Sequence, residues 1–307
     1  MARIVFDQIA IMFLILTLGI ICSKSGIITP VMIERLSVLL MQVITPIVMF
    51  VSYQSDYTKD RLDKLMWAFA LSLIAVLIQI AGSYLFIRKK RPDSDVERMS
   101  ATYSNCGFFG IPLAWGIFGK EGVFYLTGYL TVFNLFFWTH GILMVAGSTS
   151  RRQMVKNLLS PAIVGILAGL VCFLARIRLP ALVIEAMELV GNMNTPLAML
   201  VAGATVAQAG GIMGFRELRI YRTAAIRLLV IPIAVAVVFS FIPVDPMILL
   251  VIIMAAAAPT GASNTMLAIR FHRNGAYASR IFVTTTLLAI VTIAPVVAFA
   301  QMMGIVM

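Results

Sequence analysis

Long apolar stretches alternate with short polar connections along the whole chain. Ten such segments lie at about 5–23, 32–53, 64–87, 99–119, 122–147, 158–177, 181–208, 220–242, 247–269 and 276–304. About 20 apolar residues in a helix cross the hydrocarbon core of a bilayer, and each segment is about that long or longer. The pattern predicts an all-α polytopic membrane protein with ten transmembrane helices.

Two of these segments are interrupted near their centres. The first, ATYSNCGFFGIPLAWGIF, breaks between Asn105 and Pro112, and the second, IIMAAAAPTGASNTMLAI, breaks between Pro259 and Asn264. A helix interrupted at membrane depth leaves backbone groups that lipid cannot satisfy, so the break must be buried or line a cavity. Matching interruptions in two halves of a chain indicate the binding site of a transporter.

Composition narrows the class of protein further. Hydrophobic residues make up 61% of the 307 positions, charged residues 12%, and the mean hydropathy is +1.00. A soluble domain is about half apolar and a quarter charged, which excludes a large soluble core. The first segment is too long for a cleavable signal. Cys22, Cys106 and Cys172 lack metal-ligand spacing, so we expect free thiols, with no metal and no cofactor.

The net charge of +11 follows the topology rather than a nucleic-acid partner. If connections alternate between two sides, one side holds sixteen Lys and Arg and the other, with both termini, holds seven. Short loops rich in Lys and Arg stay cytoplasmic. We therefore expect a multi-pass protein of the cell membrane, the inner membrane of a bacterium, with both termini outside. The runs Arg88 to Arg91 and Arg151 to Arg152 would then meet anionic membrane lipids on the cytoplasmic face.

The first half of the chain repeats in the second at an offset of 150 residues. The paired positions are Gly19 with Gly169, Cys22 with Cys172, Pro30 with Pro180, and Thr45-Pro46 with Thr195-Pro196. Five segments per repeat is an odd number, so equivalent segments run in opposite directions. The pattern predicts a 5+5 inverted repeat, with residues 1–150 and 151–307 as its halves and the site between them. Accidental similarity between apolar helices is the alternative.

The interruptions themselves predict an anion site. In an inverted repeat, the half-helices that begin near Ile111-Pro112 and Ser263-Asn264 both point their N-termini at the membrane centre. Helix N-termini carry free N–H donors and partial positive charge. Pro112 suits an early helical position, and Gly261 would allow close backbone approach, as would two glycines of the first break. The candidate substrate-binding residues are Asn105, Gly107, Gly110, Pro112, Pro259, Thr260, Ser263 and Asn264.

Segments 2 and 7 carry a smaller interruption each, at Thr45-Pro46 and at Asn194-Thr195-Pro196. An ordinary proline kink and a substrate contact account for them equally well. Gln42 and Asn194, with Asn192, are secondary site candidates for that reason. For the other intramembrane polar residues we favour interhelical hydrogen bonds; these are Gln79, Asn134, His140 and Gln208.

Arg227 is a charge inside segment 8, which makes it a functional candidate by default. It lies about two turns beyond Arg219 at the cytoplasmic end, so we favour snorkelling to the headgroups. No acidic residue lies clearly at mid-depth, which argues against a Na⁺ site built from carboxylates. Proton coupling would then use an acid nearer the surface, such as Asp56, Asp60, Asp63 or Glu185.

Three stretches resemble the auxin efflux carrier family, which includes the plant PIN exporters and bacterial transporters of malonate or other small carboxylates. They are NCGFFGIPLA from Asn105, APTGASNTMLA from Ala258, and NTPLAMLVAGATVA from Asn194. The resemblance implies crossed helices 4 and 9 whose Asn and Pro residues bind a carboxylate, here Asn105, Pro112, Pro259 and Asn264. It also implies a scaffold of helices 1, 2, 6 and 7, often dimeric, and a moving transport domain of helices 3–5 and 8–10. The long central loop of the plant members is missing here, and auxin as the substrate is unsupported.

The sequence therefore predicts a secondary transporter that moves a small organic anion, a malonate-like mono- or dicarboxylate, by alternating access of an elevator-like domain. The alternatives are a membrane sensor or channel for organic anions, and a Na⁺-coupled carrier like the bile-acid symporters. An enzyme is not expected, because no Ser–His, Asp–Asp or HExxH arrangement occurs.

Overall fold

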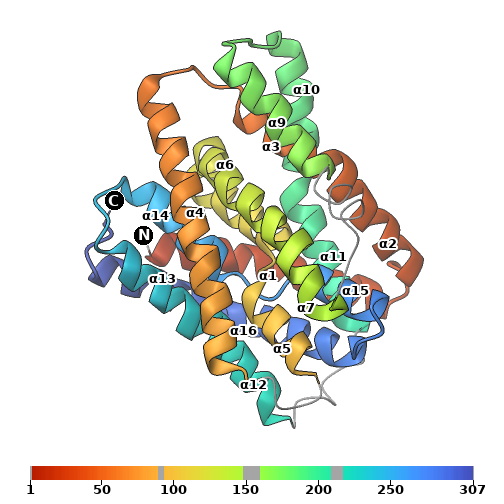
Figure 1. Cartoon of the computed structure of the whole chain (residues 1–307). Helices are drawn as coiled ribbons and strands as arrows, with labels where there is room; N and C mark the ends of the chain where they lie inside the picture. Colours follow the sequence, from red (N-terminus) through yellow and green to blue (C-terminus); the bar gives the residue numbers. More distant parts are fainter. Residues whose placement is uncertain (1, 89–92, 148–159, 209–216, 307) are drawn as a thin grey trace.

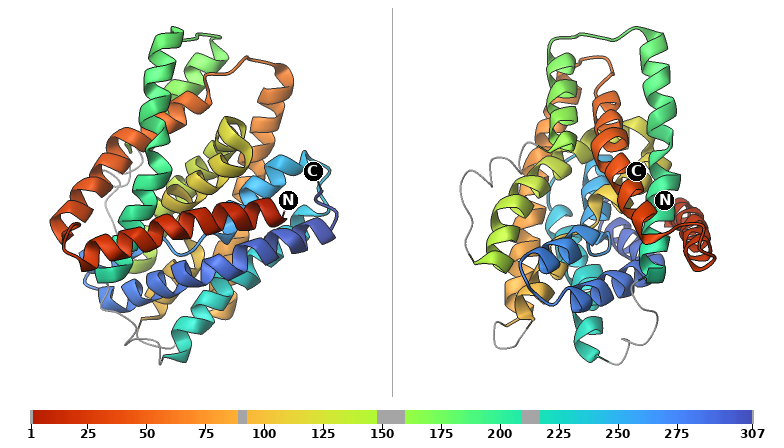
Figure 2. Two further views of the ribbon diagram at one scale, coloured as in Figure 1. Left: turned by 180° about the vertical axis from the view of Figure 1, so that it is seen from behind. Right: turned by 90° about the vertical axis from the view of Figure 1, so that its right-hand side faces the viewer.

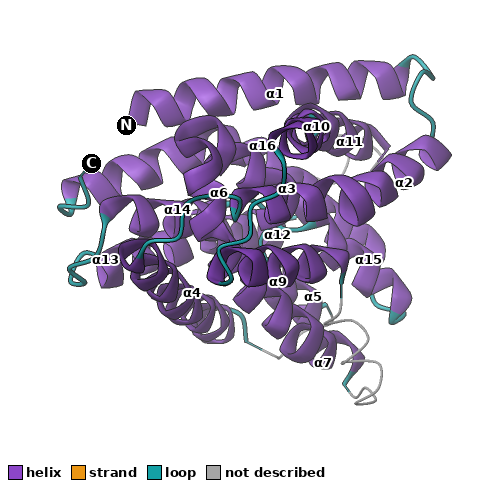
Figure 3. Cartoon of the chain, turned by 90° about the horizontal axis from the view of Figure 1, so that it is seen from above, coloured by secondary structure: helices purple, strands orange, loops and turns teal. Residues whose placement is uncertain are grey.

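A computed structural model describes residues 2–88, 93–147, 160–208 and 217–306. Within these ranges the chain forms helices and no strand (Figures 1 and 3). The first half contains α1 Ala2–Lys24, α2 Pro30–Leu39, α3 Thr45–Ser52, α4 Lys59–Phe86, α5 Ser94–Thr102, α6 Ile111–Phe136 and α7 Ile142–Ala146. The second half contains α9 Pro161–Leu174, α10 Ala181–Asn192, α11 Asn194–Gln208, α12 Leu218–Ala225, α13 Ile231–Phe239, α14 Pro246–Ala257, α15 Ala262–Arg270 and α16 Gly275–Met302.

Seven continuous helical stretches of the described chain are long and apolar enough to cross a membrane. They are Arg3–Lys24, Pro30–Ser52, Lys59–Phe86, Cys106–Ala146, Ala181–Gln208, Leu218–Phe239 and Gly275–Met302. Two further apolar helices, α9 and α14, are shorter. The expected multi-pass, all-helical class is confirmed, whereas the ten-helix inverted repeat stays a prediction.

The stretch Cys106–Ala146 is two helices joined at Gly119. That residue has φ 61° and ψ −146°, a backbone conformation that residues other than glycine rarely adopt. The chain therefore turns there, at the boundary expected between the fourth and fifth apolar segments. A 41-residue straight helix would far exceed the bilayer thickness, so the turn also explains its length.

In the described part of the chain, four π-helical turns widen the long helices. They are η1 Leu40–Ile44, η2 Cys106–Gly110, η3 Phe137–Gly141 and η5 Ile226–Val230. Three of them end two residues before a proline, at Pro46, Pro112 and Pro232. Proline has no N–H for the regular bond to the fourth residue before it, and a π turn absorbs that mismatch without ending the helix.

The apolar surface fits a membrane environment, and the cysteines are free as expected. Large hydrophobic side chains on the outside include Leu14 and Leu85, each 72% exposed, and such residues normally face lipid in a bilayer. The three cysteines are free, and Cys106 alone is fully buried. The basic runs expected to meet lipid headgroups fall largely on residues 89–92 and 148–159, outside the described residues.

The helices pack in two related pairs. α1 packs along α11, and α3 packs along α9. Gly203 of α11 lies so close to α1 that a Cβ there would sit 1.9 Å from the carbonyl oxygen of Leu16. Small residues at such contacts let membrane helices approach closely. α16 runs beside α1 on the same side of the molecule (Figure 2).

Candidate functional site

The two interruptions lie against each other. Ser104 and Thr260 form an isolated antiparallel β-bridge between them. The backbone N–H of Asn105 donates to the Pro259 carbonyl at 2.6 Å, and that of Gly261 donates to the Tyr103 carbonyl at 3.2 Å. Each break therefore satisfies backbone groups of the other, as membrane depth requires.

The breaks are shorter than the sequence indicates. The first covers residues 103–105, between the end of α5 at Thr102 and the start of η2 at Cys106. The second covers residues 258–261, after which α15 starts at Ala262. Our placement of Pro112 in the first turn of its half-helix is wrong, because η2 continues directly into α6. The continuous helix begins at Cys106, so Pro112 is its seventh residue although it is the second residue of α6. The π turn before Pro112 compensates for its missing N–H.

Both predicted asparagines lie at the start of a half-helix. Asn105 caps η2, where its side-chain oxygen accepts from the Phe108 N–H at 3.3 Å. The Asn264 amide donates to the Tyr103 carbonyl at 2.9 Å and to the Met99 carbonyl at 3.4 Å. Its Oδ1 is buried without a hydrogen-bond partner among the described residues. This atom is free to accept a hydrogen bond, and among the described residues it is one of ten buried side-chain atoms without a partner.

Thr260 and the glycines have separate roles in the geometry. The Thr260 hydroxyl donates to the Ser100 carbonyl at 2.9 Å, which ties the second break to α5. A Cβ at Gly261 would stand 3.2 Å from the Ser104 carbonyl oxygen, so this glycine does allow the expected close approach. At Gly107 a Cβ would meet nothing within 4 Å, and at Gly110 only a side-chain carbon at 3.5 Å. Gly107 therefore borders open space.

The first turn of α15 is the least satisfied helix start at the site. Its N-cap is Gly261, which has no side chain to bind the free N–H groups of the turn. Ser263, in that turn, is half-buried, whereas Pro112 and Pro259 are buried. An anion can bind such N–H groups directly.

The secondary candidates separate. The Thr45 hydroxyl lies 3.5 Å from the Asn194 Oδ1, so the two smaller interruptions also meet. Asn194 is 3% exposed and its α11 packs against η2. Gln42 is exposed on the outside of its helix, so the structure does not bring it to the breaks.

The other intramembrane polar residues follow the expectation in part. Gln79 bonds the hydroxyl of Tyr129 on α6 at 3.0 Å, and His140 bonds the hydroxyl of Tyr103 in the first break at 2.8 Å. The interhelical bond expected for Asn134 is wrong, because its amide donates to the Leu130 carbonyl at 2.7 Å, four residues earlier in the same helix.

The snorkelling interpretation of Arg227 is also wrong. This side chain is 0% exposed, and its guanidinium bonds backbone carbonyls at the ends of α5 and α14. Arg227 lies in η5, where Ile226, Arg227 and Leu228 are all buried, so its distance along the helix from Arg219 does not place it at the surface. It reaches both interrupted helices from a third.

Sequence reasoning also missed a buried acid. Glu97 is 2% exposed in α5 and accepts from Arg222 and from the Tyr277 hydroxyl, each at 2.8 Å. It precedes the apolar segment that begins near residue 99, so its position resembles that of a loop residue. Its pairing with an arginine 125 residues away has no local signal.

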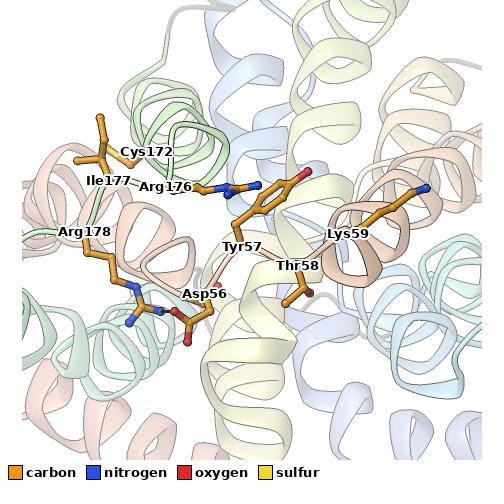
Figure 4. Close-up of a pocket in the computed structure, with 9 residues that line it drawn as sticks. Asp56, Tyr57, Thr58, Lys59, Cys172, Arg176, Ile177 and Arg178 are labelled. Carbon is orange, nitrogen blue, oxygen red and sulfur yellow. Dashed lines mark ion pairs between the residues drawn. The ribbon is translucent and has the colours of Figure 1, made fainter.

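A pocket of about 460 Å³ lies away from the breaks, between the α3–α4 and α9–α10 connections (Figure 4). Two of its three basic side chains are engaged: Arg178 pairs with Asp56 at 2.7 Å, and Arg176 lies 4.8 Å from the Tyr57 ring centre. Asp56 and Arg178 are largely exposed. Both partners of this pair are open to solvent, which weakens the attraction of any charge there, whereas the groups at the breaks are buried.

Comparison with known proteins gives two findings. Residues 4–297 match the model of the family described as "Membrane transport protein". A protein from Methanothermobacter thermautotrophicus described as an "Uncharacterized transporter" is 31% identical over 112 residues. That match covers 33% of this chain and 37% of the relative.

Proposed function

Because the chain belongs to the membrane transport protein family, that of the auxin efflux carriers, we propose that it is a secondary carrier for a small organic anion. The observation that carries the proposal is the contact between the two interruptions, with one half-helix beginning just after each. The Ser104–Thr260 bridge lies two residues before Cys106 and two before Ala262, where these half-helices start. Their partial positive charges therefore converge on one place.

A malonate-like mono- or dicarboxylate is the substrate class that we propose. Free N–H groups at the uncapped start of α15 suit a carboxylate, and the open space beside Gly107 offers room for it. The unpartnered Asn264 Oδ1 suits a hydrogen-bond donor of the substrate, such as a second carboxyl group that carries a proton. Such a substrate would bring its proton along, which is the proton coupling that we propose.

We propose alternating access, and the burial of these groups supports it. Asn105 is 9% exposed and Asn264 2% exposed, so a ligand reaches them only after surrounding helices move apart. The swapped packing of α1 on α11 and α9 on α3 supports the 5+5 inverted repeat, since an offset of about 150 residues relates the pairs. We propose that the first, second, sixth and seventh of the ten apolar segments form a scaffold, through which two copies pair. The other segments would form the moving domain, and both termini would lie outside the cell membrane.

The test is uptake of labelled malonate and related acids into proteoliposomes. We expect Asn105→Ala and Asn264→Ala to insert and fold but to lose transport. Asn134→Ala is the matched control, because its amide bonds only within its own helix. Transport at the wild-type rate by either site variant would refute the site.

Counterflow separates a carrier from a channel or sensor. If the protein is a carrier, unlabelled acid preloaded inside the proteoliposomes accelerates the entry of labelled acid, because each reorientation exchanges one molecule for another. A channel shows no such stimulation, and a sensor shows binding, measured by thermal shift, without flux. A wild-type requirement for Na⁺ would favour a carrier like the bile-acid symporters.

A further inference from the structure

Arg227 donates to five acceptors on three other elements. Its Nε bonds the Ala258 carbonyl at 3.0 Å, and its Nη2 bonds the Ala256 carbonyl. Its Nη1 bonds the Ala101 carbonyl at 3.1 Å, the Thr102 carbonyl at 3.0 Å and the Gln79 Oε1 at 3.0 Å. Among the described residues these partners are four backbone carbonyls and one amide, with no carboxylate. A guanidinium buried in this way is held by helix ends instead of by an acid.

Three of the carbonyls belong to the last residues before the two interruptions, and the fourth, that of Ala258, belongs to the first residue of the second interruption. α5 ends at Thr102, and α14 ends at Ala257. The last carbonyls of a helix have no intrahelical partner and carry about half a negative charge. Two such ends meet here at membrane depth, where their repulsion is poorly screened. A cation between them stabilises both.

In carriers with interrupted helices, half-helix C-termini and unwound carbonyls commonly coordinate the coupling cation. In this chain the guanidinium takes that place. We propose that Arg227 is a built-in counter-cation, a positioning residue that holds the ends of α5 and α14 together so that transport needs no Na⁺ or K⁺. The proposal rests on the carrier function proposed above and goes beyond it by assigning the cation dependence.

The choice of arginine fits this geometry. Its planar fork has five N–H donors and stays charged, whereas lysine offers three donors from one point. Only a fork reaches α5 on one side and α14 on the other with the same side chain. Gln79 of α4 fixes one arm of the fork and itself bonds the Tyr129 hydroxyl.

The first experiment uses the wild-type protein in proteoliposomes. Labelled malonate, with other mono- and dicarboxylates in parallel, is offered in Na⁺, K⁺ or choline medium at equal ionic strength. We expect equal initial rates in all three. A rate that needs Na⁺ or K⁺ would overturn the proposal, because the site would then hold an inorganic cation as well.

The second experiment removes the guanidinium of Arg227. Arg227→Ala should lose transport by about 100-fold, as misplacement of binding groups does. Guanidinium at millimolar concentration should restore a large part of the rate, whereas urea, which is similar in shape but neutral, should not. Arg227→Lys should keep part of the rate without guanidinium. The matched control is Arg219→Ala, eight residues earlier and half-buried, which should transport normally.

A readout independent of substrate separates this proposal from the carrier function. Millimolar guanidinium should raise the apparent Tm of Arg227→Ala in detergent, while the wild type and Arg219→Ala should not respond. If no acid is transported by the wild type but this shift occurs, the function fails and the counter-cation stands. Normal transport by Arg227→Ala, or a folded variant that guanidinium neither stabilises nor reactivates, would overturn the counter-cation. If Arg227→Ala does not fold, Arg227→Lys and the cation series in the wild type decide.

Discussion

Two buried threonines allow the hydrogen bonding at the breaks to be measured separately from packing. Thr260 and Thr286 are 0% and 1% exposed, and valine replaces threonine with nearly the same shape. The Thr260 hydroxyl donates to the Ser100 carbonyl at 2.9 Å, whereas the Thr286 hydroxyl has no partner among the described residues. Thr260→Val therefore removes a bond, and Thr286→Val removes an unsatisfied polar group.

The expected magnitude follows from what remains after each change. α5 ends at Thr102, so the Ser100 carbonyl lacks a regular intrahelical donor and stays buried and unpaired in Thr260→Val. Thr260→Val should lower the free energy of unfolding by about 1 to 2 kcal/mol, since interhelical bonds in membranes are individually modest and a carbonyl left without a donor adds to the cost. Thr286→Val should be neutral or stabilising, because a hydroxyl without a partner is costly to bury.

The assay is the apparent Tm in detergent at one fixed scan rate, since membrane proteins often unfold irreversibly. About 2 to 4 °C accompanies each kcal/mol in a chain of about 150 to 250 residues, so Thr260→Val should melt a few degrees lower. Equal losses in both variants would show that the shape of the side chain matters and the hydroxyl does not. That result would refute the hydrogen-bond reasoning.

Further predictions concern packing and the buried acid. Gly203→Ala should push α1 from α11 by roughly 1.5 Å to reach ordinary contact and lower the apparent Tm by the equivalent of about 1 to 3 kcal/mol. Gly107→Ala, which faces open space, should melt like the wild type; an equal loss in both variants would contradict the steric argument. Arg222→Ala should destabilise more than Glu97→Gln, because it leaves a buried carboxylate without its cation. The reverse order of apparent Tm would show that Glu97 does not depend on this pair.

The positions of the breaks could be predicted because Asn, Gly and Pro together inside an apolar run rarely belong to an uninterrupted helix. Asn105 and Asn264 are indeed at helix starts, and the two breaks do meet. What the sequence could not supply is where each helix restarts. A π turn at Cys106–Gly110 needs no residue type of its own, so Pro112 seemed to mark a start that it does not mark.

Arg227 and Glu97 show a second limit. Depth was estimated along one helix, and both residues lie near an expected membrane surface by that measure. Both bond partners more than 100 positions away, on α5, α12 and α16, and the other partners of Arg227 near α14 are about 30 positions away. Hydropathy is a sum over neighbours in sequence, so it carries no information about such contacts. A charge within a few turns of a segment end can therefore be buried or solvated with the same local pattern.

The bond between the breaks is made by backbone atoms. Asn105 donates through its main-chain N–H, Pro259 accepts through its carbonyl, and Gly261 and Tyr103 do the same in return. These two bonds do not depend on which side chains the four residues carry, because every residue supplies the same carbonyl and nearly every residue the same N–H. A substitution in a side chain beside the junction can therefore change what the site contacts while these two backbone bonds stay in place.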